Sequence, residues 1–322
     1  MNILINGTGA IGIGLGASMI SQGANVSFFA REETANAIRK NGIKRTGIFN
    51  HYSFGPESFK VYTDYKDIPD NEFDFVLVSS KTIANDDISR KLNEHKSILK
   101  EDAKIIIFQN GFANDEPYLR FFPKEQVYCA RVITGFKRPE RYISEVTVHT
   151  EPILLGSLQK DDDGEFIDSR PVSIISKMIN DSGIPSETTE ELDKFLWAKM
   201  LYNCSLNPLG AILNGNYGKL MENEYSVKIM NELIDEIFEV IKASGYRTNW
   251  DSPEEYREVF YSKLVPDTYN HRSSTLQDIS KRQKTEIDTL NGKVIELGEK
   301  YGVDVSVNKT IYNIIKTIES EF

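Results

Sequence analysis

The chain has 322 residues, of which 40% are hydrophobic and 27% are charged. These fractions are ordinary for globular proteins and exclude disordered, collagen-like and low-complexity chains. At about 150 residues per domain, the length predicts two domains. The formal net charge of -10 argues against general nucleic-acid binding, because the protein's field repels phosphate backbones.

Cysteine and histidine usage excludes two further classes. Cys129 and Cys204 are too few for a disulfide framework and form no C-x-x-C pair. The four histidines lie in polar contexts without metal-ligand spacing, so we expect no metal site.

The apolar N-terminus lacks the basic residues of a signal peptide and is interrupted by glycines, and no run of about 20 apolar residues follows. We expect a cytoplasmic protein without a membrane segment.

The first half of the chain alternates short apolar runs with helical stretches. The runs at 2–6, 25–29, 73–79 and 104–108 are rich in Ile, Val, Leu and Phe, which is typical of strands buried on both faces of a parallel sheet. Helical candidates at 10–22 and 86–99 lie between them. This alternation predicts a doubly wound α/β sheet. Further strand-like runs at 127–134, 146–150 and 153–158 predict an antiparallel addition to the same sheet.

The character of the sequence changes near residue 188, beyond which it is largely helical. The stretch 186–190, Ser-Glu-Thr-Thr-Glu, combines capping residues with acids that favour a helix N-terminus. We therefore expect a Rossmann-type nucleotide-binding domain over 1–188 and an all-α substrate-binding domain over 189–322.

A glycine-rich turn follows the first predicted strand and opens a helix: Gly7, Thr8, Gly9, Ala10, Ile11 and Gly12. In G-x-G-x-x-G, the first glycine makes the tight turn, the second lets a pyrophosphate approach the backbone, and the third allows close packing of helix on strand. The helix N-terminus then receives the phosphate charge. A glycine-rich packing turn is the alternative, but the context favours dinucleotide binding.

The end of the second predicted strand decides which dinucleotide is bound. Arg31 stands there, where an NAD site usually has an acid and an NADP site has a cation. Glu32 and Glu33 follow and weaken the distinction. We favour NADP(H) over NAD(H), with a solvated loop arginine as the alternative.

Two more loops follow strands at the sheet edge where α/β proteins bind ligands. Lys81 ends the run that begins at Phe75, and Asn110 with Gly111 ends the run that begins at Ile105. Taken singly, each is an ordinary solvated lysine or turn. Their shared edge makes them candidates for the cofactor site.

One helical stretch, 195–213, is apolar on nearly every face. Lys199, Asn203 and Asn207 recur in it at four-residue steps and so form one stripe. A buried lysine is rare unless it is paired or functional, and burial would lower its pKa toward neutrality. Lys199 is therefore a candidate proton donor to a carbonyl oxygen. Pro208 is expected to end or kink this helix.

Together these residues resemble the ketopantoate reductase family over almost the whole chain. The matching motifs are GTGAIG at 7–12, SSK ending at Lys81, QNG at 109–111, WAKMLYNCSLNPLGAI at 197–212 and SSTLQDISKRQKTEIDTLNG at 273–292. The last two are not generic Rossmann features. From its residues alone, the last motif predicts only a charged amphipathic helix with a serine cap.

The resemblance implies NADPH-dependent reduction of 2-dehydropantoate to pantoate in pantothenate synthesis. It implies a catalytic Lys199 at the substrate carbonyl, with Glu286 on the substrate's other hydroxyl and Ser274 on its carboxylate. Asn203 and Asn207 would line the pocket, while Lys81 and Asn110 would meet the nicotinamide-ribose end, Asn110 also contacting substrate. The implied helical domain is like that of 6-phosphogluconate dehydrogenase, with the active site between the domains.

The sequence departs from the family at two places. A substrate-contacting asparagine of the family falls on Tyr217, with Asn216 adjacent, and the stretch 249–269 is poorly matched. A straight helix would also separate Ser274 from Glu286 by ~18 Å and ~120°. We therefore predict a break between these two residues.

Two other functions remain open. One is a related reductase of another 2-oxo acid, suggested by Tyr217 and the 249–269 stretch. The other is a non-catalytic NADP-binding sensor, which the set Lys199, Asn203, Asn207, Ser274 and Glu286 argues against. The expected partner is a small-molecule 2-oxo acid, with no nucleic acid and no membrane, and the apolar helical domain makes a homodimer a reasonable expectation.

Overall fold

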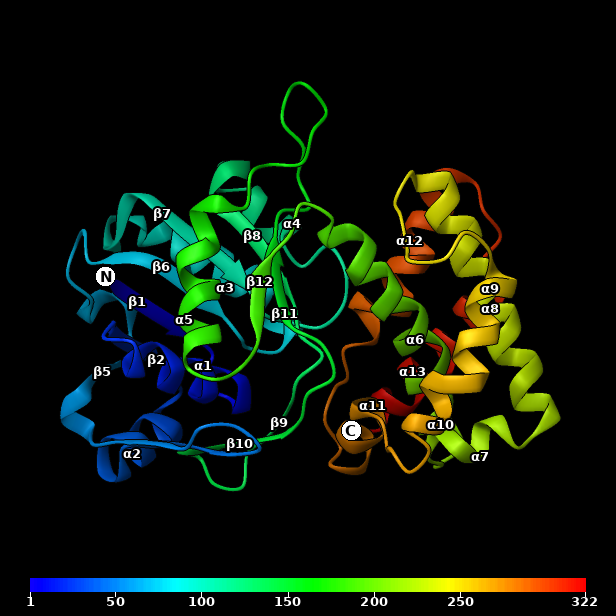
Figure 1. Cartoon of the computed structure of the whole chain (residues 1–322), viewed down its shortest axis with the longest axis horizontal. Helices are drawn as coiled ribbons and strands as arrows, with labels where there is room; N and C mark the ends of the chain where they lie inside the picture. The colour runs from blue at the N-terminus through cyan, green and yellow to red at the C-terminus, as the bar shows by residue number, and fades with distance from the viewer. The chain divides into compact units, whose positions relative to one another are not determined.

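The computed structural model describes all 322 residues, which form two compact units (Figure 1). The first comprises Met1–Gln109 and Asn114–Leu192, and the second comprises Asn110–Ala113 and Asp193–Phe322. The chain thus joins the second unit for four residues after Gln109 before it returns to the first.

An eight-stranded sheet forms the core of the first unit, in the order β12-β11-β8-β7-β6-β1-β2-β5. Its parallel strands are β5 (Phe59–Tyr62), β2 (Asn25–Phe29), β1 (Asn2–Asn6), β6 (Phe73–Val78), β7 (Leu99–Ile107) and β8 (Val127–Arg131). The order reverses between β1 and β6, as in dinucleotide-binding folds. The predicted α/β class and doubly wound sheet are confirmed, and β1 and β2 have the predicted bounds.

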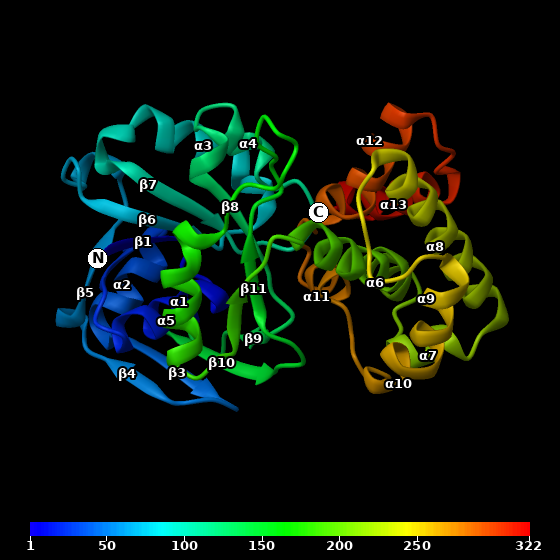
Figure 2. The same ribbon diagram turned by 45° about the horizontal axis from the view of Figure 1, so that its top comes forward.

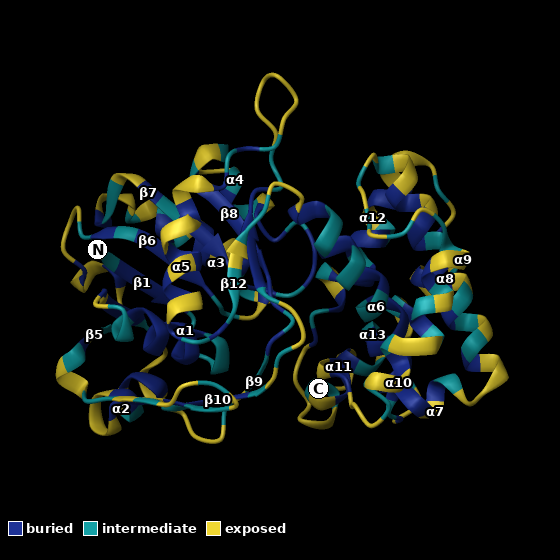
Figure 3. Ribbon diagram, viewed as in Figure 1, coloured by how far each residue is buried: buried dark blue, intermediate teal, exposed yellow.

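Helices cover the sheet because its central strands are apolar on both faces (Figure 3). The helices of this unit are α1 (Ala10–Ser21), α2 (Glu32–Asn41), α3 (Asn85–Glu94), α4 (Glu116–Leu119) and α5 (Ser173–Asp181). Helices α1 and α5 pack against each other and against the sheet (Figure 2).

The predicted antiparallel addition is only partly right. Strand β11 (Ile153–Gly156) does pair antiparallel with β8, and β12 (Ser186–Thr188) extends that edge. The expected strand at 146–150 instead belongs to a separate sheet, whose members are β4 (Tyr52–Phe54), β3 (Ile43–Gly47), β10 (Ile143–Val148) and β9 (Gly135–Lys137).

The small sheet packs on α1, which explains why it is separate. A Cβ on Gly14 of α1 would lie 2.8 Å from the Phe136 ring and 2.9 Å from Ser144 Oγ, so the helix surface has to be flat there. The fully buried Arg45 guanidinium of β3 donates to Ser18 Oγ of α1 at 2.5 Å. A periodicity argument cannot reveal such a packing surface, because it depends on a helix that precedes β9 and β10 by more than 100 residues.

The second unit is helical. Its helices are α6 (Leu192–Ile212), α7 (Tyr217–Met221), α8 (Glu224–Ser244), α9 (Pro253–Val259), α10 (Val265–Asp267), α11 (Ser274–Ser280), α12 (Asn291–Tyr301) and α13 (Ser306–Ser320). Residues 260–264 form a π-helical turn between α9 and α10. None of the protein's helices combines the length and the apolar character needed to cross a membrane.

Pro208 does not end α6, which continues to Ile212. A proline inside a helix removes one N–H donor and leaves the carbonyl four residues earlier without its helical partner. That carbonyl belongs to Cys204, and it accepts a hydrogen bond from Asn291 Nδ2 at 3.2 Å. The side chain from α12 therefore replaces the missing donor. Of the two expected effects of Pro208, an end or a kink, the end of the helix at this point was wrong.

The predicted break between Ser274 and Glu286 is confirmed. Helix α11 ends at Ser280, Arg282 has a left-handed φ of 52°, and a 3₁₀ turn over Ile287–Thr289 begins after Glu286. The charged amphipathic helix predicted from the residues of 273–292 is thus limited to its first part.

Candidate functional site

The glycine turn after β1 packs closely against the backbone around it. Gly7 has φ +107°, and a Cβ there would lie 2.3 Å from the backbone nitrogen of Ser80. A Cβ on Gly12 would lie 2.1 Å from the Gly7 carbonyl oxygen. With any side chain at this position, α1 could not pack as closely on the turn that follows β1. These two glycines serve the fold, because any side chain would meet backbone atoms.

Gly9 differs from the other two glycines of the turn. A Cβ on Gly9 would meet no atom within 4 Å, and its φ of -88° is accessible to any residue. The fold therefore does not require glycine here, whereas a ligand lying against the backbone would. Gly9 caps α1, whose first amides, from Ala10 and Ile11, lack helical acceptors and suit an anion. Thr8 Oγ1 donates to the Phe29 carbonyl at 3.0 Å and ties this turn to the end of β2.

The acids after Arg31 are engaged with other cations. Arg31 is the exposed N-cap residue of α2. Glu32 pairs with Arg39 at 3.8 Å, and Glu33 pairs with Arg141 at 2.5 Å. Neither carboxylate is paired with Arg31 itself, and the choice between NADP(H) and NAD(H) stays a prediction.

Lys81 lies in the first unit just after β6, as the N-cap of the 3₁₀ turn Thr82–Ala84. Two side-chain hydrogen bonds fix the loop that carries Lys81. Ser79 Oγ donates to the Gly7 carbonyl at 2.6 Å, and Gln109 Nε2 donates to the Ser80 carbonyl at 2.8 Å. Gln109 was not among the predicted site residues, although it belongs to the QNG motif. Its amide joins the ends of β6 and β7.

Lys199 and Asn110 meet in the second unit. The Lys199 ammonium donates to Asn110 Oδ1 at 2.5 Å, although 89 residues separate the two in sequence. Lys199 is half-buried on α6 rather than fully buried. Because its Oδ1 accepts from Lys199, the Asn110 amide group is oriented. The predicted lowering of the Lys199 pKa stays a prediction.

Backbone and ring contacts fix the loop 110–113, and with it the position of Asn110. Gly111 has φ +99°, and a Cβ there would lie 2.6 Å from the Thr289 carbonyl oxygen. The same carbonyl accepts the Phe112 N–H at 3.1 Å, and the Phe112 ring lies 4.8 Å from that of Trp197 on α6. Thr289 N–H in turn donates to the Glu286 carbonyl at 3.2 Å. The loop thus brings together Asn110, Lys199 and the turn that carries Glu286.

Further along α6, Asn203 is half-buried and Asn207 is buried. Tyr217 OH donates to Asn207 Oδ1 at 2.5 Å, and burial holds the Tyr217 pKa well above its usual value, so the hydroxyl remains a donor. This bond leaves Asn207 Nδ2 to act as a donor. Asn216 instead caps α7, with its Oδ1 accepting from the Lys219 amide at 3.0 Å. Tyr217, which the sequence flags only as a departure, therefore orients one of the candidate site residues.

Ser274 is the first residue of α11 and is exposed. The preceding Ser273 caps the helix and donates from Oγ to the Asn207 carbonyl at 3.0 Å. This bond fixes the start of α11 beside the end of the α6 stripe. Ser274 thus lies near Asn207, whereas Glu286 lies on the turn that contacts the 110–113 loop.

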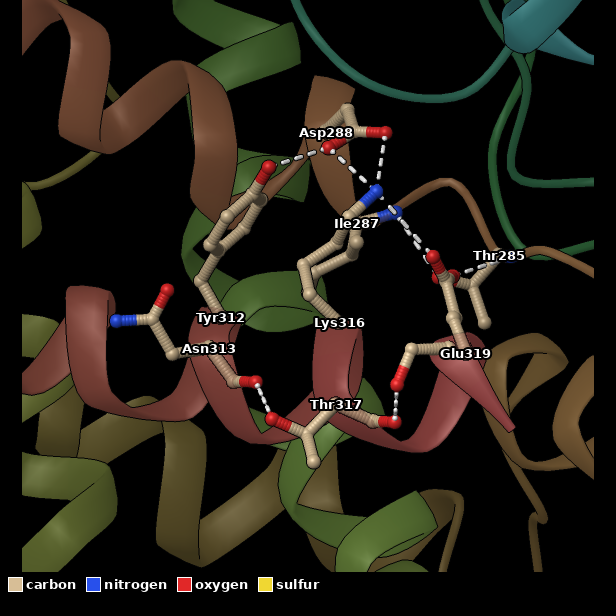
Figure 4. Close-up of polar contacts among 9 residues, drawn as sticks. Thr285, Ile287, Asp288, Tyr312, Asn313, Lys316, Thr317 and Glu319 are labelled. Carbon is tan, nitrogen blue, oxygen red and sulfur yellow. Dashed lines mark hydrogen bonds and ion pairs between the residues drawn. The ribbon is translucent and has the colours of Figure 1, made fainter.

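A polar network from α13 holds the segment on both sides of Glu286 (Figure 4). Before it, Thr285 donates to Glu319 Oε1 through its N–H at 2.7 Å and its Oγ1 at 2.6 Å. After it, Asp288 accepts from Tyr312 OH at 2.6 Å and from Lys316 Nζ at 3.1 Å. Both neighbours are anchored, so the Glu286 carboxyl is carried by a fixed backbone.

Glu319→Ala is expected to lower the free energy of unfolding by about 1–3 kcal/mol, because it leaves the buried Thr285 N–H without an acceptor. Glu319→Gln keeps an oxygen for Thr285 and is the matched control, with a smaller loss. Urea denaturation of both variants measures the difference. An alanine variant as stable as the wild type would show that Glu319 does not anchor this segment.

The comparisons with known proteins identify the family. A family model described as "Ketopantoate reductase PanE/ApbA" matches residues 3–160, and its C-terminal counterpart matches 191–319. The 2-dehydropantoate 2-reductase of Aquifex aeolicus is 34% identical over 99% of this chain and 97% of its own. The chain belongs to the ketopantoate reductase family. Membership makes it an oxidoreductase of a nicotinamide-dependent family.

Solved structures agree with this fold. A PanE/ApbA family ketopantoate reductase from Ralstonia eutropha superimposes with a TM-score of 0.83 and 23% identity, covering 100% of this chain and 99% of its own. D-mandelate dehydrogenase, solved with NADH and anilino(oxo)acetate, also gives 0.83, at 18% identity and the same coverage. At these identities the likeness concerns the fold alone.

Proposed function

We propose that the protein reduces 2-dehydropantoate (ketopantoate) to pantoate with NADPH, as a step of pantothenate biosynthesis. The observation that carries the proposal is the contact of Lys199 with Asn110, in a chain of the ketopantoate reductase family. It places a cation with three N–H donors beside an oriented amide, on the helix that also carries Asn203 and Asn207. A substrate carbonyl needs such a donor when it becomes a hydroxyl.

The chemistry divides between cofactor and protein. A bound nicotinamide supplies the hydride that reaches the ketone carbon. Lys199 gives a proton to the carbonyl oxygen, so the C=O bond becomes CH–OH, and the lysine regains a proton from water. Asn110 Oδ1 holds the ammonium in place, which reduces the entropy cost of aligning donor and oxygen.

The remaining residues bind and orient the substrate in this proposal. The Ser274 hydroxyl, at the start of α11, receives the substrate carboxylate, and Glu286 accepts a hydrogen bond from the distal hydroxyl. Asn203 and Asn207 donate from α6, with the Asn207 amide oriented by Tyr217. In the first unit, the turn 7–12 holds the pyrophosphate, Lys81 meets the nicotinamide ribose, and Arg31 binds the 2′-phosphate.

A substrate panel tests the reaction. NADPH oxidation is followed with ketopantoate, with 3,3-dimethyl-2-oxobutanoate and with phenylglyoxylate, the oxo acid that corresponds to mandelate. We expect ketopantoate to give the highest kcat/KM. A higher value for another acid would assign the chain to a different 2-oxo acid, and NADPH binding without turnover on any acid would favour a non-catalytic sensor.

Gly9→Ala is expected to leave the melting temperature unchanged and to weaken NADPH binding. A methyl group at Gly9 meets no protein atom but would fill the space where the pyrophosphate approaches. The expected loss is roughly 5- to 150-fold, the effect of about 1–3 kcal/mol of overpacking. Fluorescence titration with NADPH and a thermal melt measure the two effects.

Gly12→Ala is the matched comparison, because its methyl group would clash with the Gly7 carbonyl. That variant should lose stability as well as affinity. If Gly9→Ala bound NADPH as tightly as the wild type, this turn would not hold the pyrophosphate.

A further inference from the structure

The loop between β9 and β10 carries two arginines that the proposed mechanism does not use. Arg138 Nη2 donates to Thr34 Oγ1 at 3.1 Å and to the Arg141 carbonyl at 3.0 Å. Arg141 pairs with Glu33 at 2.5 Å. Thr34 and Glu33 lie in the first turn of α2, directly after Arg31. The loop of the small sheet is therefore fastened to the segment that follows β2.

Around the first turn of α2, one arginine lacks a carboxylate partner. Glu32 and Glu33 are paired with Arg39 and Arg141, whereas the Arg138 guanidinium pairs with no carboxylate. Arg138 Nε is buried and has no hydrogen-bond partner. Burial, and then the charge of Arg141, lower the Arg138 pKa. A half-buried cation without an acid is costly unless an anion offsets it.

We propose that Arg138, which contacts the first turn of α2 through Thr34, contributes together with Arg31 to the cofactor's 2′-phosphate site. The proposal rests on the proposed use of NADPH and adds a residue from a different sheet. A phosphate dianion takes several N–H donors, and guanidinium groups suit it because their donors are arranged as a rigid fork. The Glu32 and Glu33 amides of the first turn of α2 point donors toward the same end of the helix.

The opposite reading is that Arg138 only clamps the loop to Thr34. The two readings differ in what they predict for ligands with and without a 2′-phosphate. If Arg138 only clamps the loop, its loss would disturb the fold of this region and weaken the binding of all adenine nucleotides alike. If Arg138 instead contacts the phosphate, its loss would weaken the binding only of nucleotides that carry the 2′-phosphate.

The test uses the full-length protein and calorimetric titration with 2′,5′-ADP and with 5′-AMP. Arg138→Met is expected to weaken 2′,5′-ADP binding roughly 10- to 100-fold, the effect of losing hydrogen bonds to a charged group. Binding of 5′-AMP should not change. Arg138→Lys, which keeps the charge but not the fork, should fall between. Lys137→Met, the neighbouring exposed cation of β9, is the matched control and should leave both affinities unchanged.

Three results would overturn the inference. They are unchanged 2′,5′-ADP binding in Arg138→Met, an equal loss for 5′-AMP, and a loss that Lys137→Met reproduces. If the wild type already bound 2′,5′-ADP no better than 5′-AMP, the proposed use of NADPH would fail together with the role of Arg138. If the wild type discriminates and Arg138→Met does so equally well, only the role of Arg138 fails.

Discussion

Lys199→Met is expected to lower kcat for ketopantoate reduction by about 10²- to 10⁴-fold, the usual contribution of a positioned general acid. Methionine approximates the length of lysine but cannot donate a proton. The NADPH dissociation constant should stay unchanged, because the glycine turn and Arg31 belong to the first unit and Lys199 belongs to the second. Steady-state kinetics and fluorescence titration measure the two quantities separately.

Lys194→Met is the control for this variant. Lys194 lies on the same helix five residues earlier and is also half-buried, so its loss tests the effect of removing any cation from α6. Turnover in Lys199→Met close to that of the wild type, or an equal loss in Lys194→Met, would remove the assigned role of Lys199.

Glu286→Gln is expected to lower kcat/KM for ketopantoate roughly 10- to 100-fold, because a hydrogen bond to a carboxylate is stronger than one to a neutral amide. The effect should depend on the substrate's distal hydroxyl. With 3,3-dimethyl-2-oxobutanoate, which lacks that hydroxyl, wild type and variant should have the same kcat/KM. The pair of enzymes and the pair of substrates form a cycle that isolates this one contact.

Glu258→Gln removes an exposed carboxylate from α9 of the same unit and is the matched control, with no expected effect on either substrate. An equal loss on both substrates in Glu286→Gln would contradict the contact. It would instead indicate that the substitution disturbs the turn that Thr285 and Asp288 anchor (Figure 4).

The sequence was most informative where local rules decide the structure. The bounds of β1 and β2 follow from apolar runs between glycine and polar residues, and Gly7 and Gly12 have the predicted steric roles. The break after α11 followed from distance, because one helix cannot carry both Ser274 and Glu286 to one small molecule.

The sequence was least informative where distant segments decide the structure. Helix α6 passes through Pro208 because Asn291, 87 residues from Cys204, supplies the missing donor. Residues 110–113 follow a sheet strand yet belong to the helical unit, because Phe112 packs on Trp197. The placement of Arg138 beside α2 likewise depends on a second sheet that no local pattern indicates.

The most direct test of the proposed function is the oxidation of NADPH with ketopantoate, followed at 340 nm while pantoate is quantified by mass spectrometry, with NADH in parallel. We expect one pantoate for each NADPH oxidised and a clear preference for NADPH over NADH. NADPH binding without pantoate formation would contradict the proposed reaction, and equal rates with NADH would contradict the assignment of Arg31 to a 2′-phosphate.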